Sequence, residues 1–381
     1  MISDVPLGAF LSGGVDSSTV VALMQAQSDK PIKTFSIGFN VPGFNEAEHA
    51  RKVAEHLGTH HTELYVTAEM ALDVIPKLPS LYDEPFADSS QIPTFLVAQM
   101  ARQYVTVALS GDGGDELFCG YNRYLATSQI WSKLKYCPQG LRKLIAYGLK
   151  TVPETGWDGF FKWLPMGKDW AHIGQKLHKA ANVMSANSLY ELHRGLVSQW
   201  QNPEQVVING VEPAANDCDM SDLSLNDIEL MMAFDTLNYL TDDILVKTDR
   251  AAMGVSLEGR TPLLDHEVFT FAWSLPIDYK LKDKVTKWPL RAVLYRYVPK
   301  DLIERPKAGF TVPLDHWLRG SLKEWATDLL DREKMASQGF LHVDIVHQKW
   351  NEHLSGKRNW ASQLWIILMF QAWLKEQNCV Y

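Results

Sequence analysis

The residues with the clearest chemical potential form the string SGGVDSS at residues 12–18. This string follows a short apolar run at residues 9–11 and precedes a helix-forming segment at residues 17–25, which predicts a loop between a strand and a helix. Two glycines permit a tight turn with exposed amides. These amides, the serine hydroxyls and the helix N-terminus would form an anion cradle. Asp16 fits such a cradle if a divalent cation joins its carboxylate to phosphate groups.

A second string, SGDGGDELFCGY, occupies residues 110–121 and follows the apolar run 105–109. In a doubly wound sheet the carboxyl ends of the strands meet in one crevice, so we expect this string to approach the first. Its acids Asp112, Asp115 and Glu116 would repel one another unless a cation or a substrate group compensates their negative charge. The pattern therefore indicates a binding site more than an acidic surface turn.

Two further segments lie in the second half of the chain. One is DDILVKTDR at residues 242–250, followed by LEGRTPLLDH at residues 257–266, and the other is RPKAGF at residues 305–310. Taken alone, residues 242–266 would be interpreted as a charged helix followed by a loop. Taken alone, Lys307 would be interpreted as a solvated lysine on a short loop of defined shape. The chain has no GxxxxGK[ST] string, so the usual loop for γ-phosphoryl transfer is absent.

The string at residues 12–18 resembles the PP-loop of the N-type ATP pyrophosphatases. All four segments together, in this order and spacing, resemble the synthetase domain of glutamine-hydrolysing asparagine synthetase, of which β-lactam synthetase is a relative. The resemblance runs from about residue 3 to residue 318. It implies an enzyme that uses ATP and Mg²⁺, activates a carboxylate as acyl-AMP with release of pyrophosphate, and lets ammonia displace AMP.

The resemblance also implies roles for single residues. The cradle for ATP and pyrophosphate would consist of Ser12, Gly13, Gly14, Asp16, Ser17 and Ser18. Backbone groups at Leu11, Ile37, Ser110 and Gly111 would hold AMP. Asp16 and Asp115 would bind Mg²⁺, and Lys307 would stabilise the charge that builds on the α-phosphate, where a fixed cation is worth most in the transition state.

Asp112 stands where the family usually has glutamate, an acid that helps to form the acyl-adenylate and takes a proton from ammonia. The segment at residues 83–93 lies where the family binds its amino-acid substrate, and it contains no arginine. Because free aspartate needs a cation for its second carboxylate, the acceptor stays open between L-aspartate, our main prediction, and a sugar uronic acid of surface-polysaccharide biosynthesis. The candidate acceptor-binding residues are Asp88, Ser89, Glu116, Arg250 and Arg260.

The family's glutaminase domain, with its N-terminal cysteine nucleophile, has no counterpart in this chain, in which Ile2 follows Met1. We therefore predict an ammonia-dependent synthetase, with a separate glutaminase domain or subunit as a further source of ammonia. An inactive, truncated synthetase is the non-enzymatic alternative. Thiolation of tRNA, the rival activity in the superfamily, would require catalytic cysteines and a basic surface, and neither is visible in the sequence.

Composition narrows the class of protein further. The 381 residues carry 37 basic and 45 acidic side chains, a formal charge of −8, which argues against a basic nucleic-acid footprint. Four cysteines form no CxxC pair and no zinc spacing, which is typical of reduced thiols in a cytosolic protein. No apolar stretch approaches the roughly 18 residues of a membrane span, and no export signal is visible, so we predict a cytoplasmic location. The oligomeric state is not indicated.

The elements that must position these residues follow a strand–helix alternation over residues 1–125. Strands are expected at residues 9–11, 33–39 and 105–109, with helices at residues 17–25, 45–57 and 92–102. This predicts an α/β fold: a Rossmann-like parallel sheet with helices on both faces. A mainly helical lobe, residues 126–381, would complete the active site within one asparagine synthetase-like ATP-pyrophosphatase domain. Its clearest helical segments are residues 223–240, 268–275, 287–297, 322–330 and 360–375.

Overall fold

The computed structural model describes residues 3–39, 46–162, 173–211, 220, 223–304 and 312–377. The chain forms two compact units. The first comprises Met1–Gly120, Pro203–Pro213 and Asp235–Tyr381, and the second comprises Tyr121–Asn202 and Ala214–Phe234. Both strings that opened the sequence analysis, apart from the last residue of the second, therefore belong to the first unit.

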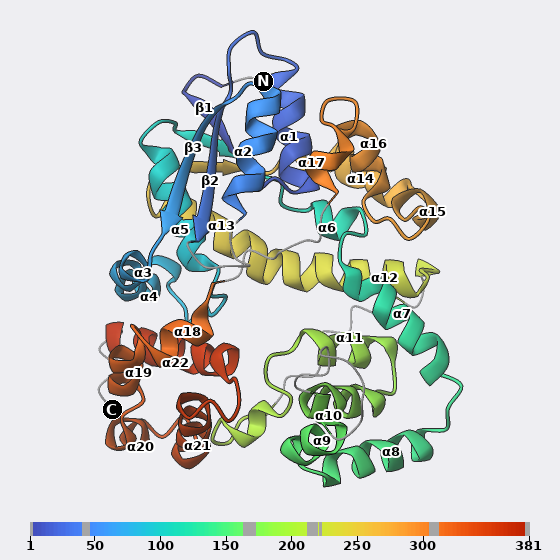
Figure 1. Cartoon of the computed structure of the whole chain (residues 1–381), viewed down its shortest axis with the longest axis vertical. Coiled ribbons are helices and arrows are strands. Elements are labelled where there is room, and N and C mark those ends of the chain that lie inside the picture. Colours follow the sequence, from blue (N-terminus) through green and yellow to red (C-terminus); the bar gives the residue numbers. More distant parts are fainter. Residues whose placement is uncertain are drawn as a thin grey trace. The chain divides into compact units, whose positions relative to one another are not determined.

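A five-stranded parallel sheet forms the centre of the first unit (Figure 1). Its strand order is β3-β2-β1-β4-β5. The strands are β1 (Leu7–Phe10), β2 (Lys33–Phe39), β3 (His60–Val66), β4 (Val107–Leu109) and β5 (Glu258–Arg260). Ala9 in β1 is opposite Thr34 on one side and Leu109 on the other. The predicted parallel α/β fold is confirmed.

Helices cover both faces of this sheet, as right-handed crossovers require. The chain moves from β1 to β3 in one direction and from β3 to β5 in the other, so α1 (Val15–Gln25) and α2 (Ala47–Leu57) share one face. The helices α5 (Gln91–Arg102) and α13 (Val246–Met253) share the opposite face (Figure 1). The α2 helix ends before Gly58, whose φ of 69° gives the left-handed conformation that commonly terminates a helix.

Two strands were not predicted from the sequence. The sequence of β3, HHTELYV, lacks an apolar run because this strand lies at the edge of the sheet. The other, β5, has three exposed residues, so its pairing with β4 depends on backbone hydrogen bonds and leaves no hydrophobic signal. It also comes from the part of the chain in which the sequence predicted helices.

The first unit contains further α-helices. Before the second unit they are α3 (Ala68–Val74), α4 (Leu78–Tyr82) and α6 (Gly114–Leu117). After it, a π-helix (Asp235–Leu245) leads into α13. The chain then forms α14 (His266–Ser274), α15 (Ile277–Lys280), α16 (Trp288–Leu294), α17 (Lys300–Ile303), α18 (Leu314–Arg319), α19 (Lys323–Leu329), α20 (Arg332–Gln338), α21 (Val343–Leu354) and α22 (Ala361–Glu376).

Helices make up the second unit. They are α7 (Asn122–Leu134), α8 (Gln139–Thr151), α9 (Glu154–Lys162), α10 (Ile173–Met184), α11 (Leu189–Val197) and α12 (Asp227–Phe234). The buried guanidinium of Arg142 links α8 to the end of α10, because its Nη1 donates to the carbonyl of Ala186 at 2.6 Å. Within the described ranges of the whole chain, no helix is both long and apolar enough to span a bilayer.

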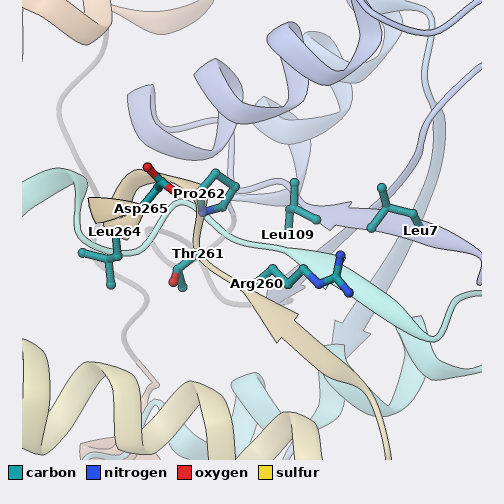
Figure 2. Close-up of a pocket in the computed structure, with 7 residues that line it drawn as sticks. All are labelled: Leu7, Leu109, Arg260, Thr261, Pro262, Leu264 and Asp265. Atoms are coloured by element: carbon teal, nitrogen blue, oxygen red, sulfur yellow. The ribbon is translucent and has the colours of Figure 1, made fainter. Parts of the chain in front are cut away.

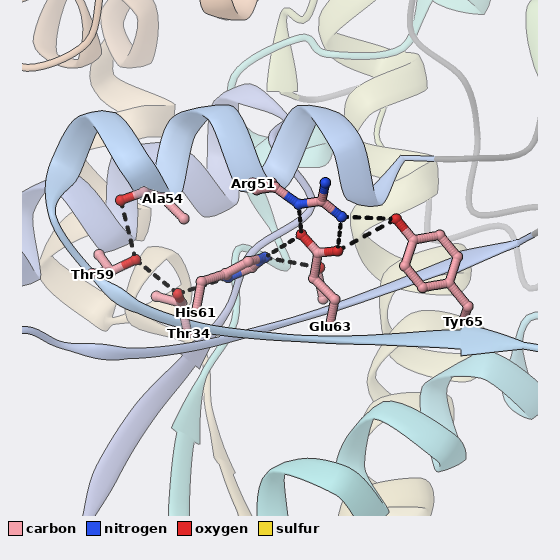
Figure 3. A network of polar contacts seen from close by, with 8 residues as sticks. Thr34, Arg51, Ala54, Thr59, His61, Glu63 and Tyr65 are labelled. Atoms are coloured by element: carbon pink, nitrogen blue, oxygen red, sulfur yellow. Dashed lines mark hydrogen bonds and ion pairs between the residues drawn. The ribbon is translucent and has the colours of Figure 1, made fainter.

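Polar side chains fix α2 against the edge strand β3 (Figure 3). Arg51 Nε donates to Glu63 Oε1 at 2.7 Å, and its Nη2 pairs with the other carboxylate oxygen and donates to Tyr65 Oη at 3.1 Å. The carboxylate is thus held by a two-pronged guanidinium contact, the arrangement that makes arginine–carboxylate pairs strong and directional. This pairing compensates for the weak hydrophobic patterning of β3.

His61 lies beside this ion pair, between two hydroxyls of β2. Its Nδ1 is 2.9 Å from Thr34 Oγ1 and its Nε2 is 3.0 Å from Ser36 Oγ. Thr34 Oγ1 also lies 2.9 Å from Thr59 Oγ1. Burial lowers the pKa of His61 below its ordinary range, although the Glu63 carboxylate acts in the opposite direction. The folded protein therefore prefers the neutral imidazole.

This preference gives the stability of the protein an acid-sensitive component. Because the folded pKa of His61 is lowered, its stabilisation is present above pH 6.5 and is lost as the pH falls through the folded pKa. We expect the His61→Gln variant, which cannot titrate, to lose less unfolding free energy between pH 7 and pH 5 than the unmodified chain. The difference is bounded by about 1.4 kcal/mol per pH unit, the slope for one proton. Urea unfolding at a series of pH values measures it, and parallel curves would contradict it.

Candidate active site

The string at residues 12–18 forms a loop between β1 and α1, as predicted. Gly13 has a φ of 71°, and a Cβ atom there would lie 2.9 Å from the backbone nitrogen of Ala50 in α2. Glycine is therefore required both by the backbone conformation and by the close approach. The hydroxyls of Ser12 and Ser17 are 2.9 Å apart, and the Gly14 N–H donates to Ser12 Oγ at 3.3 Å. The turn thus keeps hydroxyls and amides together at the start of α1.

The string that begins at Ser110 packs directly on the first turn of α1. A Cβ atom at Gly111 would lie 2.6 Å from the backbone nitrogen of Ser17, and one at Gly114 would lie 2.4 Å from Asp16 Oδ1. These are distances that a side chain could not occupy, so the glycines allow the two loops to touch. The structure therefore brings residues 12–18 and residues 110–115 together at the carboxyl ends of β1 and β4.

A lysine that the sequence analysis did not select joins the two strings. Lys287 Nζ forms an ion pair with Asp115 Oδ1 at 2.7 Å and a second one with Asp16 Oδ2. Lys287 is 4% exposed. Burial alone would lower its pKa, but the two carboxylates outweigh burial and hold the pKa above its ordinary value. The ammonium is therefore charged and balances the acids of both loops.

Backbone geometry places Lys287 at this point. The residue precedes α16 with a φ of 56°, and its N–H donates to the carbonyl of Phe118 at 3.1 Å. A Cβ atom at Gly120 would lie 2.0 Å from Lys287 Cε, so Gly120 leaves room for the lysine chain. Lys287 and Asp16 are 271 residues apart in sequence, which is why no local spacing could have identified the lysine.

The two predicted metal-binding residues converge on one cation. Asp16 and Asp115 share the Lys287 ammonium, so their carboxylates face a common point. Within the described ranges, no group of three or more His, Cys, Asp or Glu side chains could enclose a metal ion. Two carboxylates that leave other positions to phosphate oxygens and water match the binding mode of Mg²⁺. This donor set therefore fits the ion that the sequence analysis implied.

Asp112 lies within the second loop and accepts a hydrogen bond from Ser110 Oγ at 2.8 Å. Burial raises its pKa, while this hydroxyl and the charge of Lys247 act in the opposite direction without cancelling the rise. A carboxyl group with a raised pKa binds a proton more readily. The predicted AMP-binding positions Leu11 and Ile37 are buried at the end of β1 and within β2.

The candidate acceptor-binding residues lie in different places. Asp88 forms a 2.6 Å ion pair with Lys247, a second lysine that the sequence analysis did not select. Arg250 pairs with Asp83 at 2.8 Å, and both are on the surface. Arg260 pairs with Glu258, its neighbour in β5, at 2.6 Å. Ser89 is half-buried and Glu116 is buried. Lys307 lies outside the described residues.

A shallow cavity of about 380 Å³ lies beside β5 (Figure 2). It is lined by Leu7, Leu109, Arg260, Thr261, Pro262, Leu264 and Asp265. Leu264 also fills the space beside Gly113, where a Cβ atom would lie 2.3 Å from its Cδ2. None of residues 12–18 lines this cavity, so it is separate from the candidate phosphate cradle. Its contact with the second loop is through Leu264.

Comparison with known proteins shows the family of the chain. A family model described as asparagine synthase matches residues 1–375. The chain belongs to the asparagine synthase family. Asparagine synthetase (glutamine-hydrolyzing) 1 of Bacillus subtilis (strain 168) is 32% identical over 373 residues, which cover 98% of this chain and 56% of that relative.

Two further relatives are also named as asparagine synthetases. The putative asparagine synthetase (glutamine-hydrolyzing) of Mycobacterium tuberculosis (strain ATCC 25618 / H37Rv) is 35% identical over 381 residues, 98% of this chain and 55% of that relative. The putative asparagine synthetase (glutamine-hydrolyzing) 2 of Methanocaldococcus jannaschii is 37% identical over 257 residues, 66% of this chain and 46% of that relative. The chain thus spans about half the length of the curated relatives it matches.

Proposed function

We propose that this chain is an ATP-dependent amide-forming synthetase. It activates the side-chain carboxylate of L-aspartate as acyl-AMP, releases pyrophosphate, and aminates the acyl group with ammonia to give asparagine and AMP. Membership of the asparagine synthase family supports the reaction class. The observation that carries the proposal is the contact between residues 12–18 and residues 110–115, with Asp16 and Asp115 joined by Lys287.

The first loop supplies the binding groups for the leaving pyrophosphate. The backbone N–H groups at the start of α1 and the paired hydroxyls of Ser12 and Ser17 offer hydrogen bonds to phosphate oxygens. The N-terminal end of the helix adds a partial positive charge. The Lys287 ammonium pairs with both aspartates and offsets their negative charge, which would otherwise repel the nucleotide. A bound Mg²⁺ would be held by Asp16 and Asp115 and would supply Lewis-acid stabilisation of the phosphate charge.

Two residues have roles in the transfer itself. We assign Asp112 as the proton acceptor for the attacking ammonia, because its raised pKa suits a carboxylate that must take up a proton. We assign Lys307 to the α-phosphate, where a cation stabilises the charge that develops as the carboxylate attacks. The assignment of Lys307 depends on the sequence resemblance alone.

Ammonia is the proposed nitrogen source for this chain. The names of the curated relatives describe glutamine-hydrolysing enzymes, of which this chain spans about half. We propose that the chain uses free ammonia or ammonia that a glutaminase domain or subunit supplies.

Pyrophosphate release from ATP tests the reaction. The assay contains the full chain, MgCl₂, ammonium and one acid at a time: L-aspartate, D-glucuronate or L-glutamate. We expect pyrophosphate and AMP in equal amounts with L-aspartate, together with asparagine. Release with D-glucuronate alone would replace the proposed acceptor with a uronic acid. Production of ADP and phosphate, or silence with every acid, would contradict the proposal.

A further inference from the structure

Helix α8 in the second unit buries a charged residue on its inner side. The inner side consists of Arg142 and Ala146, one turn apart, and α10 packs against this helix (Figure 1). Arg142 donates from Nη1 to the carbonyl of Ala186 at 2.6 Å and from Nε to the carbonyl of Cys137 at 3.1 Å. A surface helix usually places apolar residues at such inner positions. The polarity of α8 is therefore reversed.

The outer side of α8 carries the residues that such a helix would normally bury. Leu141, Leu144 and Ile145 are spaced by three and four along the helix, so their side chains share one face. All three are exposed, Leu144 at 67%. Tyr147 lies one turn beyond Leu144 and is 72% exposed. We call these four residues the α8 face, and a contiguous apolar face of this kind typically marks an interaction site.

The chain around the α8 face carries positive charge alone. Residues 117–153, which include α7 and α8, contain no aspartate or glutamate, although the whole chain has a formal charge of −8. Four lysines of this stretch are exposed: Lys133, Lys135, Lys143 and Lys150. Lys143 and Lys150 are two turns apart in α8 and therefore flank the α8 face on the same side. The charge of this surface is complementary to an anionic partner.

We propose that the α8 face binds the surface of a lipid bilayer that contains anionic lipids, with the helix parallel to the bilayer plane. The apolar residues of the face enter the boundary between head groups and acyl chains, and Lys143 and Lys150 contact lipid phosphates. Helices that lie in this boundary combine bulky apolar residues on one face with lysines beside them. The proposal concerns a surface outside the candidate active site and does not depend on the proposed reaction.

A bilayer suits this surface better than a protein partner does. The exposed cations of the stretch are lysines, which are depleted in protein interfaces. Near an anionic bilayer each lysine raises the affinity about fivefold. The long lysine side chain can keep its ammonium among the phosphates while its stem lies on apolar surface. Tyrosine also favours the boundary between water and lipid, which agrees with the exposed Tyr136 and Tyr147.

Co-sedimentation of the full chain with vesicles tests the inference without ATP or an acceptor. One set of vesicles contains phosphatidylcholine alone, and the other contains equal parts of phosphatidylcholine and phosphatidylglycerol. We expect at least about 10-fold tighter binding to the mixed vesicles. Raising NaCl from about 0.1 M to about 1 M shortens the screening length from about 10 Å to about 3 Å and should remove most of this difference. Equal binding to both sets, or binding to neither, would overturn the inference.

Variants assign the binding to α8. We expect Leu144→Ser to weaken binding to the mixed vesicles about 10-fold. The double variant Lys143→Gln with Lys150→Gln should weaken it at least about 10-fold. The matched controls are Leu237→Ser, at a 49% exposed leucine of the first unit, and Lys334→Gln, at an exposed lysine of α20, and neither should change the binding. All these positions are exposed, so the variants should fold. Unaltered binding by Leu144→Ser or by the double variant would refute the assignment.

A second copy of the chain is the alternative occupant of the α8 face. Sedimentation equilibrium without lipid compares the unmodified chain with Leu144→Ser, and we expect the same oligomeric state for both. If the unmodified chain forms a dimer that Leu144→Ser dissociates, the α8 face is an interface between copies and the bilayer proposal is wrong. Vesicle binding without pyrophosphate release would refute only the proposed reaction, and release without vesicle binding would refute only the bilayer proposal.

Discussion

Replacing Gly111 with alanine is expected to reduce kcat/KM for pyrophosphate release at least about 100-fold. The new Cβ would lie 2.6 Å from the nitrogen of Ser17 and 2.9 Å from the carbonyl carbon of Asp16. Because these are main-chain atoms, they cannot rotate aside, and the second loop must move away from the first turn of α1. The displacement would separate Asp115 from Asp16 and open the proposed phosphate cradle.

The matched control for this experiment is Gly259→Ala. Gly259 lies in β5 next to β4, and a Cβ atom there would meet nothing within 4 Å. We expect the control to keep the activity of the unmodified chain. Thermal unfolding of both variants distinguishes local displacement from loss of the fold. If Gly111→Ala folds and works within about threefold of the unmodified chain, the contact between the two loops is not needed for the reaction.

The second large effect is expected for Lys287→Met, which removes the cation between Asp16 and Asp115. Loss of one partner from a buried ion pair typically costs about 3–5 kcal/mol, because the remaining charges are left uncompensated. We therefore expect a loss of unfolding free energy of this size in urea without metal. Because Mg²⁺ should replace the lost ammonium between the two carboxylates in the folded state, added MgCl₂ should stabilise the variant more than the unmodified chain.

Two further variants control this result. In Lys334→Met the lost pair with Asp328 is exposed, so we expect a change below about 1 kcal/mol. The double variant Asp16→Asn with Lys287→Met also removes one of the two acids that pair with the lysine, and it should recover part of the lost stability. Equal destabilisation by Lys287→Met and Lys334→Met would show that the buried lysine does not balance the two loops.

The sequence predicted the two loops well because their signals are local. Each combines an apolar run, closely spaced glycines and acids in a single stretch of chain, and each follows a strand. Lys287 lies outside the four selected segments, and Lys247 lies in the charged segment 242–250, which has no glycine turn and no preceding apolar strand. Each is an ordinary lysine at the start of a helix, and its importance comes from partners that are 271 and 159 residues away. Such roles follow from how the chain packs and are visible only in three dimensions.

The same contrast applies to the sheet. Buried strands such as β2 have hydrophobic runs that can be read directly. The edge strand β3 is held to α2 in large part by Arg51 and Glu63, and β5 by backbone pairing with β4. Neither arrangement leaves a hydrophobic period in the sequence, so both strands were missed. The arginines that the sequence offered for the acceptor differ in another way, since charge alone did not show that each has a carboxylate partner in the folded chain.

The late position of β5 in the chain affects how the protein is made. During synthesis, the ribosome releases β1 to β4 long before residues 258–260 emerge, and the whole second unit is produced in between. Until then the outer side of β4 is an open template for pairing with another nascent polypeptide. Chaperone protection of this early intermediate would matter most during that interval, and chains that stop before residue 258 should accumulate as insoluble material.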